Sequence, residues 1–182
     1  SWHAEWQPVP DFANKDFPYG QDHSLAQLAA STRNVVVEGC EDRKTERHPP
    51  APFISSSLQQ AASNALKWDP DKTMQVAQRL YEQGVISYHR TDNPNIPDEA
   101  MTDIRSVASA HGVKALDKRR VFKAADGAQE GHPAITPTYW ANESAGENTE
   151  EQALYRLIWT RALASQLEAA RYDVRTAKLL AL

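Results

Sequence analysis

The segment Gly84–Asp92, with the sequence GVISYHRTD, contains the residue types needed to cut a phosphodiester: Arg90 stands two positions after Tyr88. A tyrosine hydroxyl has a pKa near 10. Lowering that pKa to near 7, so that tyrosine can act as a nucleophile at neutral pH, requires about 4 kcal/mol, roughly three pKa units. A permanently charged guanidinium beside the phenol supplies part of that energy and also binds two phosphate oxygens at once, in a bidentate contact. If the segment is extended, Tyr88 and Arg90 project to the same face, which makes them a candidate catalytic pair.

Two helices are expected before this segment. Serines next to Leu58 offer N-caps for a helix from Ser57 to about Leu66. Asp69 followed by Pro70 is typical of a helix start, so a second helix is predicted over Thr73–Gln83, ended by a glycine. The residues expected on their buried faces are Leu58, Ala61, Ala62 and Ala65 in the first helix, and Met74, Ala77 and Tyr81 in the second.

After the tyrosine, the sequence predicts a short extended piece, a turn and a third helix. Val85–Tyr88 is the extended piece, and Pro94 and Pro97 force a turn. The helix is predicted over Asp98–His111 and ends at Gly112. Its expected buried residues are Met101, Ile104, Val107 and Ala108.

A long polar stretch separates this helix from the last one. Residues 117–148 are rich in Gly, Pro and Asn and are predicted to be mostly loop. Thr149 and Gln152 form a capping-box pattern, which predicts the longest helix over about 150–170. The residues expected along one face of this helix are Leu154, Leu157, Ile158, Arg161 and Ala164.

Composition excludes several classes of protein. The chain has 182 residues and a net charge of −4, which argues against a highly basic DNA clamp. Residues 51–125 hold ten Lys/Arg against eight Asp/Glu, so the middle is mildly positive between acidic flanks. The single Cys40 forms no intrachain disulfide and builds no zinc site. No apolar run of about 18 residues predicts a membrane span, and no secretory leader is present.

Five sequence blocks around the tyrosine occur together and in order. They are Pro50–Ala62, Thr73–Gly84, Ile86–Asp92, Glu130–Thr138 and Glu151–Arg161. This ordered set resembles the type IA DNA topoisomerases, which cut one DNA strand and pass another through the gap. The blocks span most of residues 49–173, and their joint order is far more specific than any one block.

The resemblance implies a role for several residues in the blocks. Tyr88 would be the nucleophile that becomes joined to the 5′ phosphate of the cut strand, and Arg90 would stabilise the transition state. His132 would contact DNA or the phosphate near the cleavage site. Thr91 and Asp92 would shape the surroundings of the tyrosine and belong to the DNA-binding set.

Two glutamines and a basic run are further candidates for DNA contact. Gln59 and Gln78 lie in predicted helices near the tyrosine and could hydrogen-bond DNA, although exposed helix glutamines usually have no such role. The run Lys118–Arg120 is normally a solvated face, and DNA contact is its alternative interpretation.

The expected fold is mainly α, with a helical domain that carries the tyrosine and short β segments at both ends from a neighbouring arch domain. Residues 1–49 are interpreted as a partial, β-rich segment of the arch, with a short strand at Val35–Val37 and a possible helix at Leu25–Ala30. Residues 50–172 form the helical tyrosine domain, and residues 173–182 return as a strand into the arch.

The resemblance also implies cofactors and partners. In such enzymes Mg²⁺ is bound by an acidic cluster on a separate N-terminal domain, so this chain should hold no metal and no small-molecule cofactor and should be inactive alone. Its partners would be single-stranded DNA and the rest of its own enzyme, in the cytoplasm at the bacterial nucleoid or a plasmid, with no membrane. Religation would need no ATP, because the covalent intermediate conserves the bond energy.

Two other classes of function stay open on the sequence alone. One is a helical module without catalysis that binds a protein partner, or that binds single-stranded DNA by stacking bases on exposed aromatics such as Trp68, Tyr139 or Trp140. The other is a purely structural helical domain. A binding module needs no Tyr-x-Arg sequence, so the presence of Tyr88 and Arg90 with His132 favours the enzyme.

Overall fold

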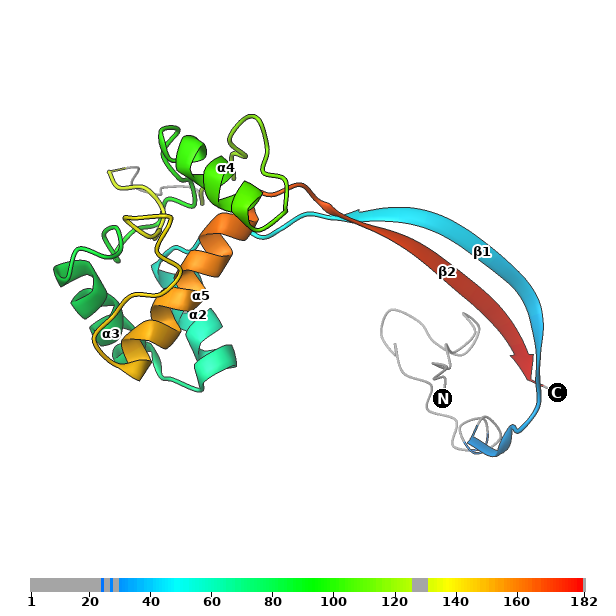
Figure 1. Ribbon diagram of the computed structural model, residues 1–182. Coiled ribbons are helices and arrows are strands. Elements are labelled where there is room, and N and C mark those ends of the chain that lie inside the picture. The colour runs from blue at the N-terminus through cyan, green and yellow to red at the C-terminus, as the bar shows by residue number, and fades with distance from the viewer. Residues whose placement is uncertain (1–23, 25–26, 28–29, 126–130, 182) are drawn as a thin grey trace. The chain divides into compact units, whose positions relative to one another are not determined.

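The computed structural model describes residues 24, 27, 30–125 and 131–181, and the chain divides into two compact units. Residues 46–171 form one unit, and residues 1–45 with 172–182 form the other. The described elements, in chain order, are β1 (Val35–Arg47), α2 (Ser55–Leu66), α3 (Pro70–Glu82), α4 (Ala100–Ala110), α5 (Thr149–Ser165) and β2 (Ala170–Ala181) (Figure 1). More described residues lie in helices than in strands, in agreement with the predicted mainly α fold.

The helical unit is built around one apolar core. Helix α3 packs against α2 and α5, and α4 adds its apolar face to the same cluster (Figure 1). The long α5 spans the unit with its buried face toward the other helices. Core side chains with no exposed surface come from every one of these helices: Leu58, Leu80, Ile104, Leu154 and Ile158.

The ends of α3 follow the sequence closely. Asp69 is the N-cap, and its carboxylate accepts a hydrogen bond from Lys72 N at 2.7 Å. Pro70 is the first helical residue, where its missing N–H costs nothing. At the other end, Gly84 has a φ of 71°, a left-handed conformation that a residue without Cβ adopts at little cost. The tyrosine segment follows directly after this turn.

The other helix starts differ from the predictions by one or more residues. Helix α5 is capped by Asn148, whose side chain accepts from Glu151 N at 3.0 Å, so the prediction that Thr149 is the cap was wrong. Helix α2 begins after Ile54, whose N–H donates to Ser57 Oγ at 3.0 Å.

Three predictions of buried position or length were wrong. Tyr81 was expected in the core but is 42% exposed, because it lies at the edge of α3 against other rings. Ala65 is exposed on α2. Helix α5 stops at Ser165 instead of about residue 170, because the chain beyond it pairs with another segment: Leu167 bridges to Ala115.

The second regular structure is a two-stranded ribbon of β1 and β2 (Figure 1). Ion pairs join Glu38 to Lys178 and Asp42 to Arg175, so rising numbers in one strand face falling numbers in the other and the strands are antiparallel. Strand β1 extends well beyond the predicted Val35–Val37. The helix predicted at Leu25–Ala30 lies largely outside the described residues.

Among the residues that the structure describes, no helix combines the length and the apolar character that crossing a bilayer requires.

Candidate functional site

The tyrosine segment pairs around Ile86 with the segment that follows His132, through an isolated antiparallel bridge to Pro137, and the chain bends at His89 and Arg90. Ser87 N donates to Thr136 O at 2.9 Å, and Thr138 N donates to Val85 O at 3.0 Å. This pairing fixes the backbone on the N-terminal side of Tyr88. The predicted extended piece is therefore present only around Ile86, and its pairing partner comes from the predicted loop.

Ser87 ties the two segments together a second time. Its Oγ donates to Ala134 O at 2.9 Å and accepts from Thr136 N at 2.9 Å. The residue directly before Tyr88 is thus held through both backbone and side chain. Sequence reasoning assigned Ser87 no role, since a serine in a short extended piece gives no signal until its partner strand is known.

The backbone after the tyrosine is held by Ser55 at the start of α2. Ser55 Oγ accepts from Thr91 N at 3.0 Å and donates to His89 O at 3.1 Å. Thr91 is only 6% exposed, and its own hydroxyl donates to His132 O at 3.2 Å. Thr91 therefore connects the tyrosine segment to the histidine loop.

The Tyr88 ring contacts three other rings, which makes a group of four. The Tyr88 ring centroid lies 4.7 Å from that of His132, 5.3 Å from Tyr81 and 5.4 Å from His89. We call these four side chains the ring cluster. Tyr88 is half-buried, and His132 is exposed. The structure thus brings together Tyr88 and His132, which stand far apart in the sequence, and adds two rings that were not predicted there.

Arg90 leaves this cluster toward solvent. It is exposed, and within the described part of the chain its guanidinium forms no hydrogen bond or ion pair. An anion can therefore bind Arg90 without first breaking an internal pair. Asp92, the next charged residue, is also exposed.

The two candidate glutamines lie on different helices. Gln78 on α3 is exposed, and its amide donates to Glu82 Oε1 at 2.8 Å within the same helix. Gln59 on α2 is half-buried.

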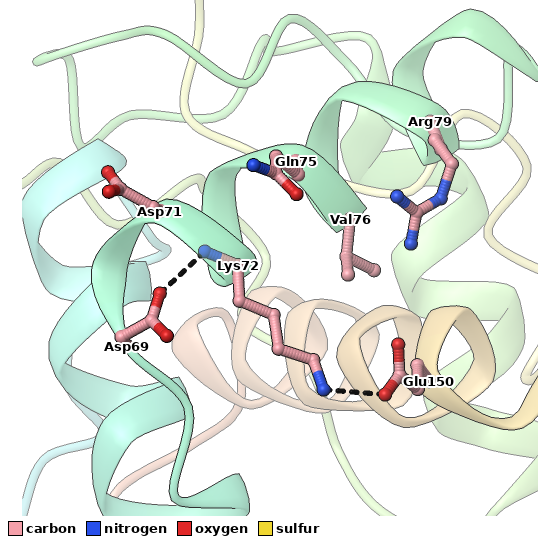
Figure 2. Close-up of a pocket in the computed structure, with 7 residues that line it drawn as sticks. All are labelled: Asp69, Asp71, Lys72, Gln75, Val76, Arg79 and Glu150. Carbon is pink, nitrogen blue, oxygen red and sulfur yellow. Dashed lines mark hydrogen bonds and ion pairs between the residues drawn. The ribbon is translucent and has the colours of Figure 1, made fainter.

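An open cleft of about 420 Å³ lies elsewhere in the helical unit, between the first turns of α3 and α5 (Figure 2). Its cations are already paired: Lys72 binds Glu150 at 2.6 Å, and Arg79 binds Glu151 at 2.8 Å. None of the predicted site residues lines it. The remaining lining residues are Asp69, Asp71, Gln75 and Val76. With its cations neutralised and two further carboxylates present, the cleft is a poor site for phosphate.

The basic run is mostly used within the fold. Arg119 pairs with Asp98 at 2.6 Å and donates to Ile96 O. Arg120 donates to Ser165 O at 2.6 Å, at the last residue of α5. Two members of the predicted solvated face are therefore structural contacts.

The aromatic residues considered for base stacking divide into two groups. Trp140 is only 5% exposed and its carbonyl accepts from Trp159 Nε1 at 2.8 Å, so the expectation that it is an exposed stacking surface was wrong. Tyr139 is 65% exposed. Trp68 is half-buried with Lys72 Nζ 4.8 Å from its ring centroid.

The described residues contain no group of three or more His, Cys, Asp or Glu side chains arranged to hold a metal ion.

Comparison with known proteins identifies the family. The family model described as DNA topoisomerase matches residues 13–181. The plasmid DNA topoisomerase I of Xylella fastidiosa is 50% identical over 178 residues, which are 98% of this chain and 27% of that protein. This chain belongs to the type IA DNA topoisomerase family. DNA topoisomerase 1 of Vibrio cholerae is 39% identical over 171 residues, 90% of this chain and 19% of that protein.

The topoisomerase fold is found in a solved structure as well. Full-length topoisomerase I from Thermotoga maritima superimposes with a TM-score of 0.67 at 30% identity, over 87% of this chain and 27% of that chain. The family predicted from the sequence blocks is confirmed. The chain spans between about a fifth and about a quarter of the length of these topoisomerases.

Proposed function

We propose that this chain is the tyrosine-bearing segment of a topoisomerase and that Tyr88 cuts single-stranded DNA. The observation that carries the proposal is the meeting of Tyr88 and His132 at 4.7 Å, with the exposed, unpaired Arg90 two residues on. A phenol beside an imidazole, with an exposed guanidinium two residues along the chain, supplies groups that phosphoryl transfer to tyrosine uses.

The reaction would be a transesterification. The Tyr88 oxygen attacks the phosphorus, the bond from phosphorus to the 3′ oxygen breaks, and a 5′-phosphotyrosine ester forms. The phenol loses its proton, and the leaving 3′ oxygen takes one up. The ester conserves the energy of the broken bond, so the 3′ hydroxyl can attack it in turn after strand passage and restore the DNA without ATP.

Arg90 and His132 would act on the phosphate. Arg90 neutralises the charge that develops on the phosphate oxygens, and because it has no partner among the described residues, its donors are available to them. His132 is exposed beside the phenol and contacts the strand. Thr91 acts indirectly, because its buried hydroxyl holds the His132 backbone.

Asp92 and the two glutamines would complete the DNA-binding surface. Asp92 is exposed and shapes the surroundings of the tyrosine. Gln78 would exchange its bond to Glu82 for one to DNA, and Gln59 would contribute from α2.

Mg²⁺ would bind in another part of the longer enzyme, where it would neutralise phosphate charge. No step at Tyr88 is assigned to it here. The partners of this chain would be single-stranded DNA and that metal-binding domain, in the bacterial cytoplasm. The 182-residue chain alone should therefore fail to relax supercoiled DNA when Mg²⁺ is added.

The test is Tyr88→Phe in the full-length enzyme that contains this chain. With Mg²⁺ and a labelled single-stranded oligonucleotide, the covalent adduct trapped by denaturation should disappear, because Phe lacks the attacking oxygen. Tyr139→Phe is the matched control, since Tyr139 is an exposed tyrosine in the same unit and its variant should form the adduct normally. An adduct that survives Tyr88→Phe would reassign the nucleophile.

The second candidate is a module that binds single-stranded DNA without cutting it. The 65% exposed ring of Tyr139 favours this alternative, since exposed aromatics stack on bases. In that case the full-length enzyme would bind the oligonucleotide but form no adduct, and Tyr139→Ala would weaken binding more than Tyr88→Phe.

A further inference from the structure

His89 is a buried residue directly after the proposed nucleophile. Its side chain is 4% exposed, and neither Nδ1 nor Nε2 has a hydrogen-bond partner. Buried polar side chains in native proteins are almost always paired, and an unpaired one costs the full desolvation of its polar groups. An apolar side chain of similar size would fill the same space without that cost, so the imidazole calls for an explanation.

Packing places this imidazole against the rings that matter for the reaction. Its ring centroid lies 5.4 Å from Tyr88 and 5.7 Å from Tyr81, and those two tyrosines meet at 5.3 Å. Ser55 Oγ holds the His89 carbonyl, so the backbone is fixed. Tyr81 is 42% exposed and its side-chain hydroxyl forms no hydrogen bond among the described residues, so its ring can shift when a strand arrives.

The electrostatic surroundings keep the free imidazole neutral. Burial lowers the pKa of His89 below its ordinary value, and the adjacent Arg90 lowers this pKa further, while Glu82 on α3 opposes both. A neutral imidazole offers one N–H donor and one acceptor. Both are therefore held ready at the site without an internal partner.

We propose that His89 is a positioning residue that supports the Tyr88 ring in the free chain and holds the bound phosphodiester by one hydrogen bond formed only in the DNA complex. This rests on the proposed function of Tyr88. An interaction that is absent in the free chain and present in the complex tightens binding of the strand, and so raises the rate of adduct formation at oligonucleotide concentrations below saturation. The unpaired nitrogens are then a cost to the free chain that the complex removes.

Three substitutions in the full-length enzyme test this, with adduct formation measured at oligonucleotide concentrations well below saturation, where the rate reports binding. His89→Phe keeps a ring of similar size but removes both nitrogens, and its rate should fall about tenfold, the factor for losing one hydrogen bond. Gln and Asn carry a donor and an acceptor near the positions of Nε2 and Nδ1 respectively. His89→Gln or His89→Asn should therefore restore much of the rate.

The thermal midpoint of the 182-residue chain separates positioning from folding. His89→Phe should leave this midpoint unchanged or raise it, because two unpaired buried nitrogens are removed. A wild-type rate with His89→Phe would overturn the proposal, and so would a loss that neither Gln nor Asn restores. Tyr88→Phe, measured in parallel, separates these outcomes from a wrong assignment of the nucleophile. If Tyr88 is not the nucleophile, the Tyr88→Phe variant still forms the adduct, whatever the His89 variants do.

Discussion

The helical unit and the β1–β2 ribbon are stabilised in opposite ways. In the helical unit, side chains from α2, α3, α4 and α5 share one core with almost no exposed surface. In the ribbon, nearly every described side chain of both strands is exposed, and backbone pairing is accompanied by ion pairs such as Arg175 with Asp42. The core therefore gives the candidate site the rigid support that it needs. The ribbon, by contrast, depends on its strand pairing.

The largest expected effect is on the core. Ile158 in α5 has no exposed surface. Ile158→Ala should lower the free energy of unfolding by about 2–5 kcal/mol, because it removes buried methyl groups and leaves a cavity. Chemical denaturation followed by circular dichroism measures this. Thr160→Ala, an exposed position in the same helix, is the control and should change little; equal effects at both positions would contradict the assignment of the core.

The next largest effect is expected in the pH dependence of stability, to which one buried carboxylate contributes. Glu151 has a side chain only 2% exposed, and it accepts bonds from Gln83, the Glu147 backbone and Arg79. These bonds, that of Gln83 first, lower the pKa of Glu151 from 4.5 to about 2. Because the folded pKa lies below the unfolded one, the stabilisation is present above about pH 4.5 and is lost as the pH falls toward 2.

Glu151→Gln should therefore lower the thermal midpoint at pH 7 and flatten its decline between pH 5 and pH 2. Glu150→Gln is the matched control, since the neighbouring Glu150 is about half exposed and pairs only with Lys72. Thermal scans across this pH range measure both variants. A Glu151→Gln profile parallel to that of the wild type would show that this carboxylate does not stabilise the fold.

The smallest effect is expected in the ribbon. Arg175 binds Asp42 through two nitrogens, at 2.6 and 2.7 Å, but both side chains are well exposed. Exposed ion pairs add little because water and salt screen them. Arg175→Ala should leave the thermal midpoint of the helical unit unchanged, as read from helical circular dichroism. A decrease comparable to that of Ile158→Ala would show that the two units unfold together.

This contrast also explains what the sequence could predict. Helices with one buried face leave a period in the sequence, so the ends of α3 and α4 were predicted to within three residues. The ribbon has no buried face and hence no alternation, so only Val35–Val37 was recognised in β1. The Asn148 cap was missed because several polar residues stand together before α5.

The candidate site shows the same limit. The sequence supplied Tyr88, Arg90 and His132 from the blocks that resemble the topoisomerases. It could not supply the contacts of Ser55 or Ser87, because these depend on segments far apart in the chain that pair only in the fold.

The most direct test of the central claim is to locate the atom that carries the cut strand. The full-length enzyme would be trapped on a single-stranded oligonucleotide and digested with trypsin, and the nucleotide-bearing peptide sequenced by mass spectrometry. The account predicts the Leu80–Arg90 peptide with a 5′ phosphate ester on Tyr88 and not on Tyr81, which lies in the same peptide. Attachment to Tyr81 or to a residue outside this peptide, or through a 3′ phosphate, would contradict it.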